Sequence, residues 1–472
     1  MSRALFATLL VSASLWAGTP KYPFPTTMNY PFGKRILSVP ASDMATEIQA
    51  NYELWQKLYY ETCSDASKGA RIKWDDSKAE SSGCPNGKCT VSEGIGYGML
   101  IFVYMDNPTN NTQAKFDNLW KYYKAFSTDG VMNWIVDGCN QKKDDGGATD
   151  AELDVAFALL MAYKQWGNEQ YLTDAKKLIN SIWSLEVDQA KLLKPGSRFG
   201  NPYNPSYFAT GVLRIFQEVD PAHDWASVAN NCLALAKKCQ NSTTGLVPDW
   251  CNNGGSSVDY NGSGTNKYGY DAVRTPWRIT LDYLWFGTKA AKEFLAPITP
   301  WIKKSTPQSS PNYIRAQYNT DGTTSVTDWT DPVTCGSLII PAMTDSTDST
   351  WLLKRSWVMV NTHPNANNNY FNDSWQIIYE LTLAGGFQNF YGKMNSVTPR
   401  IHSEKLWEAR VDNGSISLTG PGSADVDLVD PSGSIIAHGS GTYSVSLQVP
   451  RSGLYFAKIS GEATQVIPLM AP

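Results

Sequence analysis

This chain of 472 residues has few histidines and few charged residues, and each shortage argues against a class of function. It contains 4 histidines and 18% charged residues, and its formal net charge is −4. Nucleic-acid-binding domains carry a basic patch, so we expect no nucleic-acid partner. Catalytic zinc sites use mainly His and Cys ligands, and no His/Cys cluster occurs in the sequence, so we expect no metal and no other cofactor.

Long apolar runs are also missing. Residues 4–11 form a short apolar stretch that cannot span a bilayer, and no later stretch is long enough. Because Arg3 precedes this stretch and the small residue Ala17 follows it, we predict a secretory signal peptide over residues 1–18. Leu15 is larger than usual before a cleavage site, so the cleavage position stays open. We expect an exported protein that is secreted or attached to the cell surface.

The cysteines are even in number, which in an exported chain predicts disulfides. Cys84 and Cys89 flank a turn-like segment and either close a small loop or pair elsewhere. Free buried thiols are the alternative for each cysteine, and the spacing leaves the pairing open. The eight are Cys63, Cys84, Cys89, Cys139, Cys232, Cys239, Cys251 and Cys335.

Helical periodicity dominates the rest of the chain. Apolar residues at three- and four-residue spacing predict about twelve helices in one large domain over residues 22–395. After Thr398 apolar and polar residues alternate, which predicts a small antiparallel β module over residues 399–472. The predicted helices cover residues 43–61, 94–105, 113–126, 150–166, 169–185, 205–218, 224–238, 276–286, 289–303, 335–343, 349–361 and 370–384.

The first acidic motif places Glu93 directly before three glycines at two-residue spacing, in the run SEGIGYG at residues 92–98. Glycines let backbone or a flat ligand approach the carboxylate closely, which suits a general acid on the floor of a groove. Ser92 is positioned to cap the following helix. The alternative is that Ser92 and Glu93 only begin that helix, where a negative charge is favourable.

The second acidic motif is ATDAELD at residues 148–154. Thr149 and Glu152 have the spacing of a capping box, and Gly167 is placed to end the helix. In the first turn, backbone amides and the helix dipole would keep Asp150 ionised, and Asp154 shares its face of the helix. Alternatively, both acids merely decorate the start of a helix.

The third acidic motif places Asp271 in a loop that enters a helix at Thr275-Pro276, which we predict as a cap followed by proline at the first helical position. The nearby Arg274 would keep the carboxylate ionised, as a general base requires. A structural ion pair is the alternative.

Several aromatic residues lie beside polar loop residues and are candidates for sugar contact, although each alone is more often a core residue. They are Trp134, Tyr207, Trp250, Tyr270 and Tyr370, and Arg274 is a further candidate for substrate binding.

Five motifs in this order resemble glycoside hydrolase family 8, the bacterial endoglucanases and their relatives. The resemblance spans roughly residues 22–390 and implies an (α/α)6 barrel and inversion at the anomeric carbon. By position it implies that Glu93 is the general acid, Asp271 the general base and Asp150 the acid that holds the central sugar in a distorted form. The motifs are SEGIGYG at 92–98, ATDAELD at 148–154, NPSYF at 204–208, GLVPDW at 245–250 and YDAVR at 270–274.

We therefore expect a monomeric, inverting endo-β-1,4-glucanase whose partner is a β-linked polysaccharide, cellulose or mixed-linkage β-glucan. One alternative is an endo-β-1,4-xylanase of the same family, although the retained Ala-Thr-Asp in the second motif favours glucan. A non-catalytic glycan-binding protein would be expected to lack one of the three acids. A polysaccharide lyase would place a His or Arg beside a Tyr, and all four histidines lie outside the motifs.

The C-terminal β module resembles the sorting modules of type IX secretion substrates, in the run GLYFAKISG at residues 453–461 and the strands before it. This resemblance implies contact with secretion machinery or the cell surface. A carbohydrate-binding module and an inert appendage are the two alternatives.

Overall fold

The computed structural model contains two compact units, Met1–Gly392 and Lys393–Pro472. It describes residues 19–74, 84, 89–307, 310–323, 325–345, 352–355, 369–391, 408–412, 415–431, 434–448, 453–460 and 465–471. The predicted signal peptide, the turn at residues 85–88 and most of the predicted helix at 349–361 lie outside the described residues. No helix in the described ranges is both long and apolar enough to cross a membrane.

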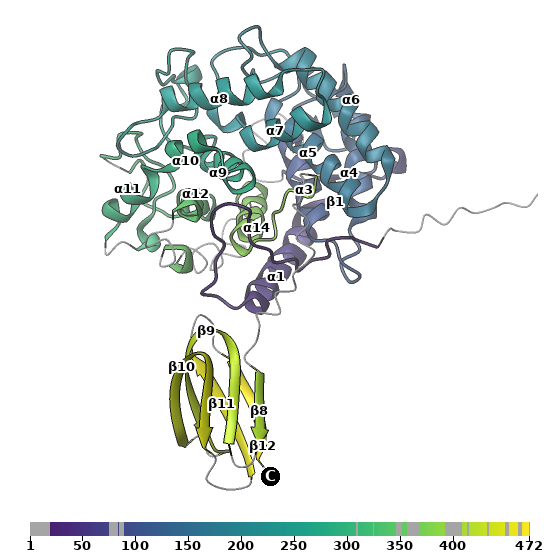
Figure 1. Cartoon of the computed structure of the whole chain (residues 1–472). Helices are drawn as coiled ribbons and strands as arrows, with labels where there is room; N and C mark the ends of the chain where they lie inside the picture. Colours follow the sequence, from purple (N-terminus) through teal and green to yellow (C-terminus); the bar gives the residue numbers. More distant parts are fainter. Residues whose placement is uncertain are drawn as a thin grey trace, which may run out of the picture. The chain divides into compact units, whose positions relative to one another are not determined.

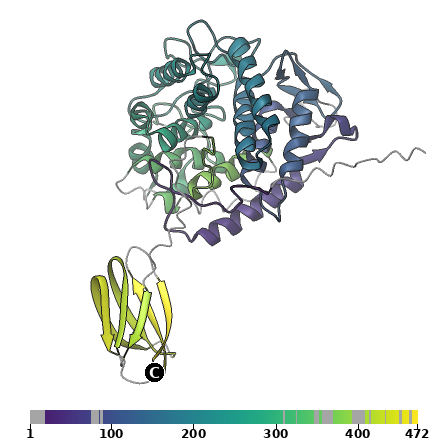
Figure 2. The ribbon, with the colours of Figure 1, turned by 45° about the vertical axis from the view of Figure 1, so that its right-hand side comes forward.

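The first unit has an inner and an outer set of helices (Figures 1 and 2). The inner helices are buried on most sides, as expected for helices whose apolar residues extend around most of the circumference. Among the described residues they are α3 (Ser92–Tyr104), α5 (Thr149–Trp166), α7 (Thr210–Val219), α9 (Thr275–Phe286), α12 (Pro332–Ile339) and α14 (Tyr370–Ala384).

The outer helices bury one face and expose the other, because their apolar residues recur at helical spacing on one side only. This alternation of inner and outer helices is an (α/α)6 barrel and confirms the predicted fold class. In the described part of the chain the outer helices are α1 (Ala41–Tyr59), α4 (Gln113–Ala125), α6 (Glu169–Glu186), α8 (Trp225–Cys239), α10 (Lys289–Leu295) and α11 (Ile298–Ser305).

The helix ends correct several sequence predictions. The predicted helix at 289–303 is two helices, because Pro297 interrupts the chain between α10 and α11. Ser92, Thr149 and Thr275 are each the first helical residue rather than the cap, and none makes a side-chain cap hydrogen bond. The predicted capping box therefore does not form. Gly167 ends α5 in the left-handed conformation with φ 71°, as predicted.

Short antiparallel strands join the helices on one side of the barrel. β3 (Cys89–Val91) pairs with β6 (Ile135–Asp137), which pairs with β7 (Gln141–Lys142). Because β3 leads directly into α3, this small sheet fixes the start of that helix beside residue 134. The other short strands are β1 (Tyr60–Thr62) with β2 (Ala70–Ile72), and β4 (Ser127–Thr128) with β5 (Val131–Met132).

Three disulfides resolve the pairing that the sequence left open. Cys84 closes the small loop to Cys89, Cys63 pairs with Cys139, and Cys239 pairs with Cys251. Cys232 and Cys335 are buried free thiols. Both alternatives considered for the cysteines therefore occur in this chain.

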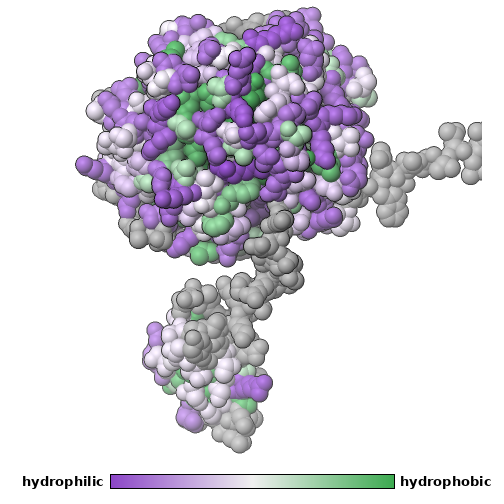
Figure 3. Space-filling view, turned by 45° about the horizontal axis from the view of Figure 1, so that its top comes forward, coloured by the Kyte–Doolittle hydropathy of each residue, from purple (hydrophilic) through white to green (hydrophobic). Residues whose placement is uncertain are grey.

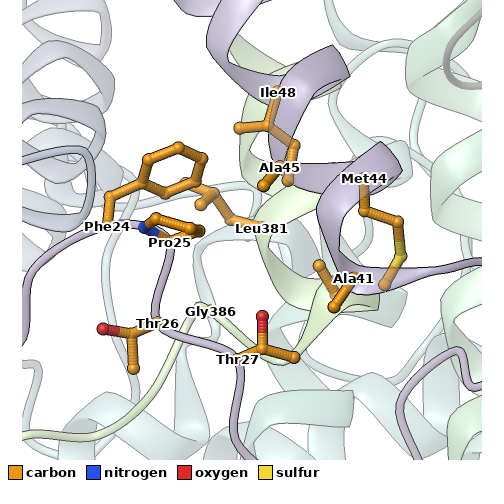
Figure 4. Close-up of a pocket in the computed structure, with 11 residues that line it drawn as sticks. Phe24, Pro25, Thr26, Thr27, Ala41, Met44, Ala45, Ile48, Leu381 and Gly386 are labelled. Atoms are coloured by element: carbon orange, nitrogen blue, oxygen red, sulfur yellow. The ribbon is translucent and has the colours of Figure 1, made fainter. Parts of the chain in front are cut away.

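The segment before α1 crosses the C-terminal ends of α3 and α14. Phe24 N–H donates to the Asp106 carbonyl, and Met28 N–H donates to the Gly385 carbonyl. Figure 4 shows the small apolar pocket that remains where Phe24, residues of α1 and Leu381 meet. Leu381 follows Tyr370 by eleven residues, about 16 Å along the helix axis. The pocket is therefore a packing gap at the far end of α14.

The second unit is an antiparallel β module, as predicted. Its strands are β8 (Glu408–Asp412), β9 (Ser415–Val429), β10 (Ile435–Gln448), β11 (Gly453–Ser460) and β12 (Gln465–Ala471). The order is β10-β9-β11-β12, with β8 also paired to β9. Alternate apolar residues point into one core, in accordance with the two-residue period of a strand.

Candidate active site

The Arg274 side chain gathers the three predicted acids. It lies at the end of a short 3-10 turn, Ala272–Arg274, that leads into α9, and only 2% of the side chain is exposed. Its Nη1 donates to Asp150 Oδ2 at 2.5 Å and to Glu93 Oε2 at 2.8 Å, while Nη2 donates to Asp271 Oδ1 at 2.5 Å. Carboxylates from three distant parts of the sequence therefore meet on one guanidinium group.

Glu93 lies in the first turn of α3, where it is held by two tyrosines. Tyr370 donates to Oε1 and Tyr97 donates to Oε2, the latter at 3.1 Å. The Ser92 N–H donates to the Trp134 carbonyl, which fixes the helix start against the small sheet. The Glu93 side chain remains 23% exposed. It is therefore oriented by buried partners but open to solvent on one side.

The glycines after Glu93 serve helix packing. A methyl group at Gly94 would lie 3.3 Å from the Tyr370 ring, and one at Gly96 would lie 3.1 Å from the Asp154 Cβ. The predicted close approach is thus made by Tyr370 and α5. These glycines bring both neighbours within reach of Glu93.

Asp150 is buried between α3, α5 and α9. Burial raises its pKa to about 7, the Arg274 guanidinium opposes that rise, and the Glu93 charge adds to it. This corrects the expectation that amides and the helix dipole keep Asp150 ionised, because desolvation outweighs both. Its Oδ1 has no hydrogen-bond partner among the described residues.

Asp271 sits at the rim of the site with 31% of its side chain exposed. The Trp250 indole N–H donates to its Oδ2 at 3.2 Å, so both carboxylate oxygens are held by donors. The loop that carries it is anchored by Asp249, whose Oδ1 accepts from the backbone N–H groups of residues 269, 271 and 272. Burial raises the pKa of Asp249 well above its usual range, and the Asp271 charge adds to the rise.

A second buried ion pair lies next to the pair formed by Asp150 and Arg274. Asp154 and Arg278 form a bidentate pair at 2.7 and 2.9 Å, and both are buried. Asp154 follows Asp150 by four residues on α5, and Arg278 follows Arg274 by four residues near the start of α9. Since residues four apart share a helix face, the two pairs stack and set the register of α5 against α9.

The aromatic residues predicted to contact sugar differ in how directly they reach these acids. The Tyr207 ring centroid lies 5.3 Å from the Arg274 guanidinium carbon. Trp134 is 40% exposed and donates to Asp144 at 2.7 Å. Tyr270 donates to Asp331 at 3.0 Å, while Tyr370 is largely buried and reaches the site through its hydroxyl. Their roles in sugar binding stay predictions.

Further residues of the site were missed from sequence. Tyr260 stacks on Trp250 with centroids 5.4 Å apart, and Phe199 meets both rings edge-on. Asp249 lies in the motif GLVPDW, where the sequence alone assigns it no role, and Arg278 lies outside all five motifs. The four-residue spacing of two arginines opposite two similarly spaced acids was the signal that could have found the second ion pair. Figure 3 shows apolar residues reaching the surface of the helical unit in a hollow bordered by hydrophilic ones.

Comparison with known proteins gives consistent matches. Residues 24–384 match the model of glycosyl hydrolases family 8. Endoglucanase 2 of Ruminiclostridium josui is 33% identical over 400 residues, which cover 82% of each chain. Endoglucanase C of Ruminiclostridium cellulolyticum is 31% identical, covering 87% of this chain and 86% of that one.

Solved structures agree with these sequence matches. A β-1,3-1,4-glucanase from Paenibacillus sp. X4 superposes with a TM-score of 0.71 at 28% identity, covering 78% of this chain and 99% of that one. A reducing-end-xylose releasing exo-oligoxylanase superposes with a TM-score of 0.61 at 20% identity, covering 75% of this chain and 96% of that one. The second match shows the shared fold alone.

Proposed function

Because this chain belongs to glycosyl hydrolases family 8, and is therefore a glycoside hydrolase, we propose that it is an inverting endo-β-1,4-glucanase acting on cellulose or mixed-linkage β-glucan. The observation that carries this proposal is the convergence of Glu93, Asp150 and Asp271 on Arg274. The endoglucanase and glucanase names of the relatives support the choice of substrate.

In this proposal Glu93 donates the proton to the leaving glycosidic oxygen. Its partial exposure lets substrate reach it, and its contacts with Tyr370 and Tyr97 orient it. A proton must be available, and the local charge favours one: three carboxylates share one guanidinium group, so full ionisation would leave a net negative site. The pKa of about 7 at Asp150 is consistent with a proton held in this cluster.

Asp271 acts as the base that activates water, and Asp150 holds the central sugar. Asp271 binds one end of the Arg274 guanidinium and Glu93 binds the other, which keeps the two carboxyl groups apart. An inverting enzyme needs a separation of roughly 6.5–9.5 Å to fit a water, whereas a retaining enzyme has about 5–5.5 Å. The shared guanidinium supports the inverting spacing, which stays a prediction.

Two measurements test this function. Initial rates on a soluble cellulose derivative, mixed-linkage β-glucan, xylan and chitosan should be highest on one of the first two; preference for xylan would favour the xylanase alternative. Proton NMR of a fresh digest of a β-linked chain should show the α-anomer first. A β-anomer as the first product would remove Asp271 from the base role.

We also propose that the protein is exported by its first 18 residues and acts as a monomer outside the cell or attached to its surface. The three disulfides support an oxidising compartment, because disulfides persist mainly there. The β module would provide sorting or surface contact. Fractionation of cells that express the full chain, with and without residues 1–18, tests export directly.

A further inference from the structure

Two buried glutamates near Asp150 take no part in the reaction proposed above. Glu152 is in the first turn of α5, and Glu186 is the last residue of α6. Both are completely buried. Burying a carboxylate is costly unless it is paired or protonated, so this pair requires an explanation.

The hydrogen bonds of the two carboxyl groups are incomplete. Glu152 Oε1 accepts from the Met132 N–H and the Tyr123 hydroxyl, both at 3.2 Å. Glu152 Oε2 and both oxygens of Glu186 have no hydrogen-bond partner of normal geometry among the described residues. A carboxylic acid, unlike a carboxylate, carries an O–H donor. One proton placed between the two groups would therefore supply one of the missing donors and join an oxygen of each group.

The surrounding charges favour such a proton. Burial is the main cause that raises the pKa of Glu152 well above its usual range, and the Glu186 charge is the next. Burial raises the pKa of Glu186 to about 8; the Asp150 charge adds to the rise, while Thr149 and Lys194 oppose it. Tyr123 is the other titratable group that faces the pair, and burial raises its pKa too.

The pair also contacts the segment that leads into Asp150. A methyl group at Gly147 would lie 3.1 Å from Glu186 Oε1, so the loop rests against this carboxyl group. The same loop is held from the other side, where the Gly147 N–H donates to Ser197 and the Thr149 N–H donates to the Pro195 carbonyl. Two buried anions at this point would repel each other directly under the loop.

We propose that Glu152 and Glu186 share a proton as a buried carboxyl pair that holds the start of α5, and hence Asp150, in place and loosens it at alkaline pH. Both are positioning residues. The sign follows from linkage: an unfolded or opened segment loses this proton near the usual pKa of glutamate, whereas the closed segment keeps it to higher pH. Stability of the segment is fully present at acid pH and falls as pH rises through the pKa of the pair.

Hydrogen exchange across pH tests the pair without substrate. In the wild-type protein the opening constant of amides in residues 146–151, corrected for intrinsic exchange, should rise between pH 5 and 8. The rise should be up to about tenfold per pH unit for each of two protons that the closed segment holds, one on Asp150 and one in the pair. In Glu186→Gln, which cannot titrate there, the rise should be shallower by up to about tenfold per pH unit, and the rise that remains is due to Asp150. A rise unchanged in Glu186→Gln, or absent from the wild type, would overturn the proposal.

A matched control separates positioning from burial alone. Glu380 on α14 is also completely buried and has a pKa raised to about 8 by burial, but its partners are Asn51 and Gln376. Glu380→Gln should change global stability with pH and leave the exchange of residues 146–151 as in the wild type. A rise at 146–151 that is as shallow in Glu380→Gln as in Glu186→Gln would overturn a local pair.

A double variant tests the sharing itself. If one proton serves both groups, Glu152→Gln alone should make the rise as shallow as Glu186→Gln does, and the double variant should go no further than either single variant. Additive effects would mean that the two groups titrate independently and would overturn the shared proton.

The consequence for catalysis rests on the proposed function. KM for soluble β-glucan should increase more between pH 6 and 8.5 in the wild type than in Glu186→Gln, with kcat at pH 6 similar in both. Equal increases would overturn the positioning role. If neither protein hydrolysed β-glucan, the proposed function would fail, whereas the exchange measurements would still decide whether the pair holds the segment.

Discussion

Arg274 determines, at the scale of single residues, how three acids coexist in one site. Its two terminal nitrogens bind Glu93 and Asp150 on one side and Asp271 on the other. Such charge-assisted bonds are roughly twice as strong as neutral ones and fix direction as well as distance. Removing any one acid would therefore alter the position of the other two as well as the chemistry.

The role of Glu93 is tested by Glu93→Gln, which keeps the side-chain shape but cannot donate an acidic proton. We expect kcat on soluble β-glucan to fall about 10²–10⁴-fold, the usual contribution of a general acid, while binding of a cello-oligosaccharide changes little. Glu293→Gln on the exposed surface of α10 is the control and should be neutral. Turnover near the wild-type rate in Glu93→Gln would reject the assignment.

Asp150 gives the protein a pH-dependent stability that can be measured. Its pKa is raised from 3.8 to about 7 in the folded state, so the folded protein keeps a proton that the unfolded chain has lost. Its contribution to stability is full below about pH 4 and is lost as pH rises to about 7. In Asp150→Asn the decrease in Tm between pH 4 and 7 should be shallower than in the wild type. A parallel decrease in both proteins would show that Asp150 titrates normally.

The identities of the three acids could be predicted from sequence, but the protonation of Asp150 could not. Glu93, Asp150 and Asp271 stand in motifs that local reasoning can find. The pKa of Asp150 depends on burial by α3 and on charges from Arg274 and Glu93, which lie far away in sequence. The role of Asp249 could not be predicted for a related reason, because its three backbone donors come together only when the loop at 269–272 folds.

At the scale of elements, the apolar periodicity predicted the positions of helices well. The side chains that usually cap helices predicted the first helical residue less well. Residues 370–384 form α14 with the predicted bounds. In contrast, Ser92, Thr149 and Thr275 were predicted as caps and lie inside the helices. At these sites the preceding strand or loop sets where the helix begins, as β3 does for α3. The freed Glu152 side chain takes part in the buried pair instead of a capping box.

The contact between α3 and α5 depends on Gly96. A methyl group there would lie 3.1 Å from the Asp154 Cβ, and Asp154 is locked by its bidentate pair with Arg278. In Gly96→Ala the two helices must separate slightly, so we expect a loss of about 1–3 kcal/mol in the free energy of unfolding, typical of overpacking. Denaturant unfolding measures this directly.

Gly200→Ala is the matched control for this substitution, because nothing lies within 4 Å of the added methyl group. It should leave both stability and activity near the wild-type values. Equal stability of Gly96→Ala and Gly200→Ala would show that α3 and α5 have room to adjust. Loss of activity in Gly96→Ala beyond its loss of stability would indicate that the shift also displaces Asp150.

At the scale of the whole molecule, the change from helical to alternating periodicity predicted two structural units. Each unit has its own apolar core: one within the helical barrel and one formed by alternate residues of the β strands, such as Val426 and Leu428. The disulfide pairing could not be foretold, since it depends on which loops the barrel brings together. Cys63 and Cys139, for example, are 76 residues apart in sequence.

Separate cores predict that the barrel folds and works without the β module. The three acids and Arg274 all belong to the first unit, and the match to the family ends at residue 384. A chain that ends at Thr398 should therefore keep its cooperative unfolding transition and its kcat and KM on soluble β-glucan, and differ only in where it accumulates in the producing culture. Val426→Asp places a charge in the core of the β module and serves as a second variant, because it disrupts that core while keeping the chain length. Both variants should match the full chain in kcat and KM. A truncated protein that unfolds cooperatively but has lost activity would show that residues after 398 help to shape the site.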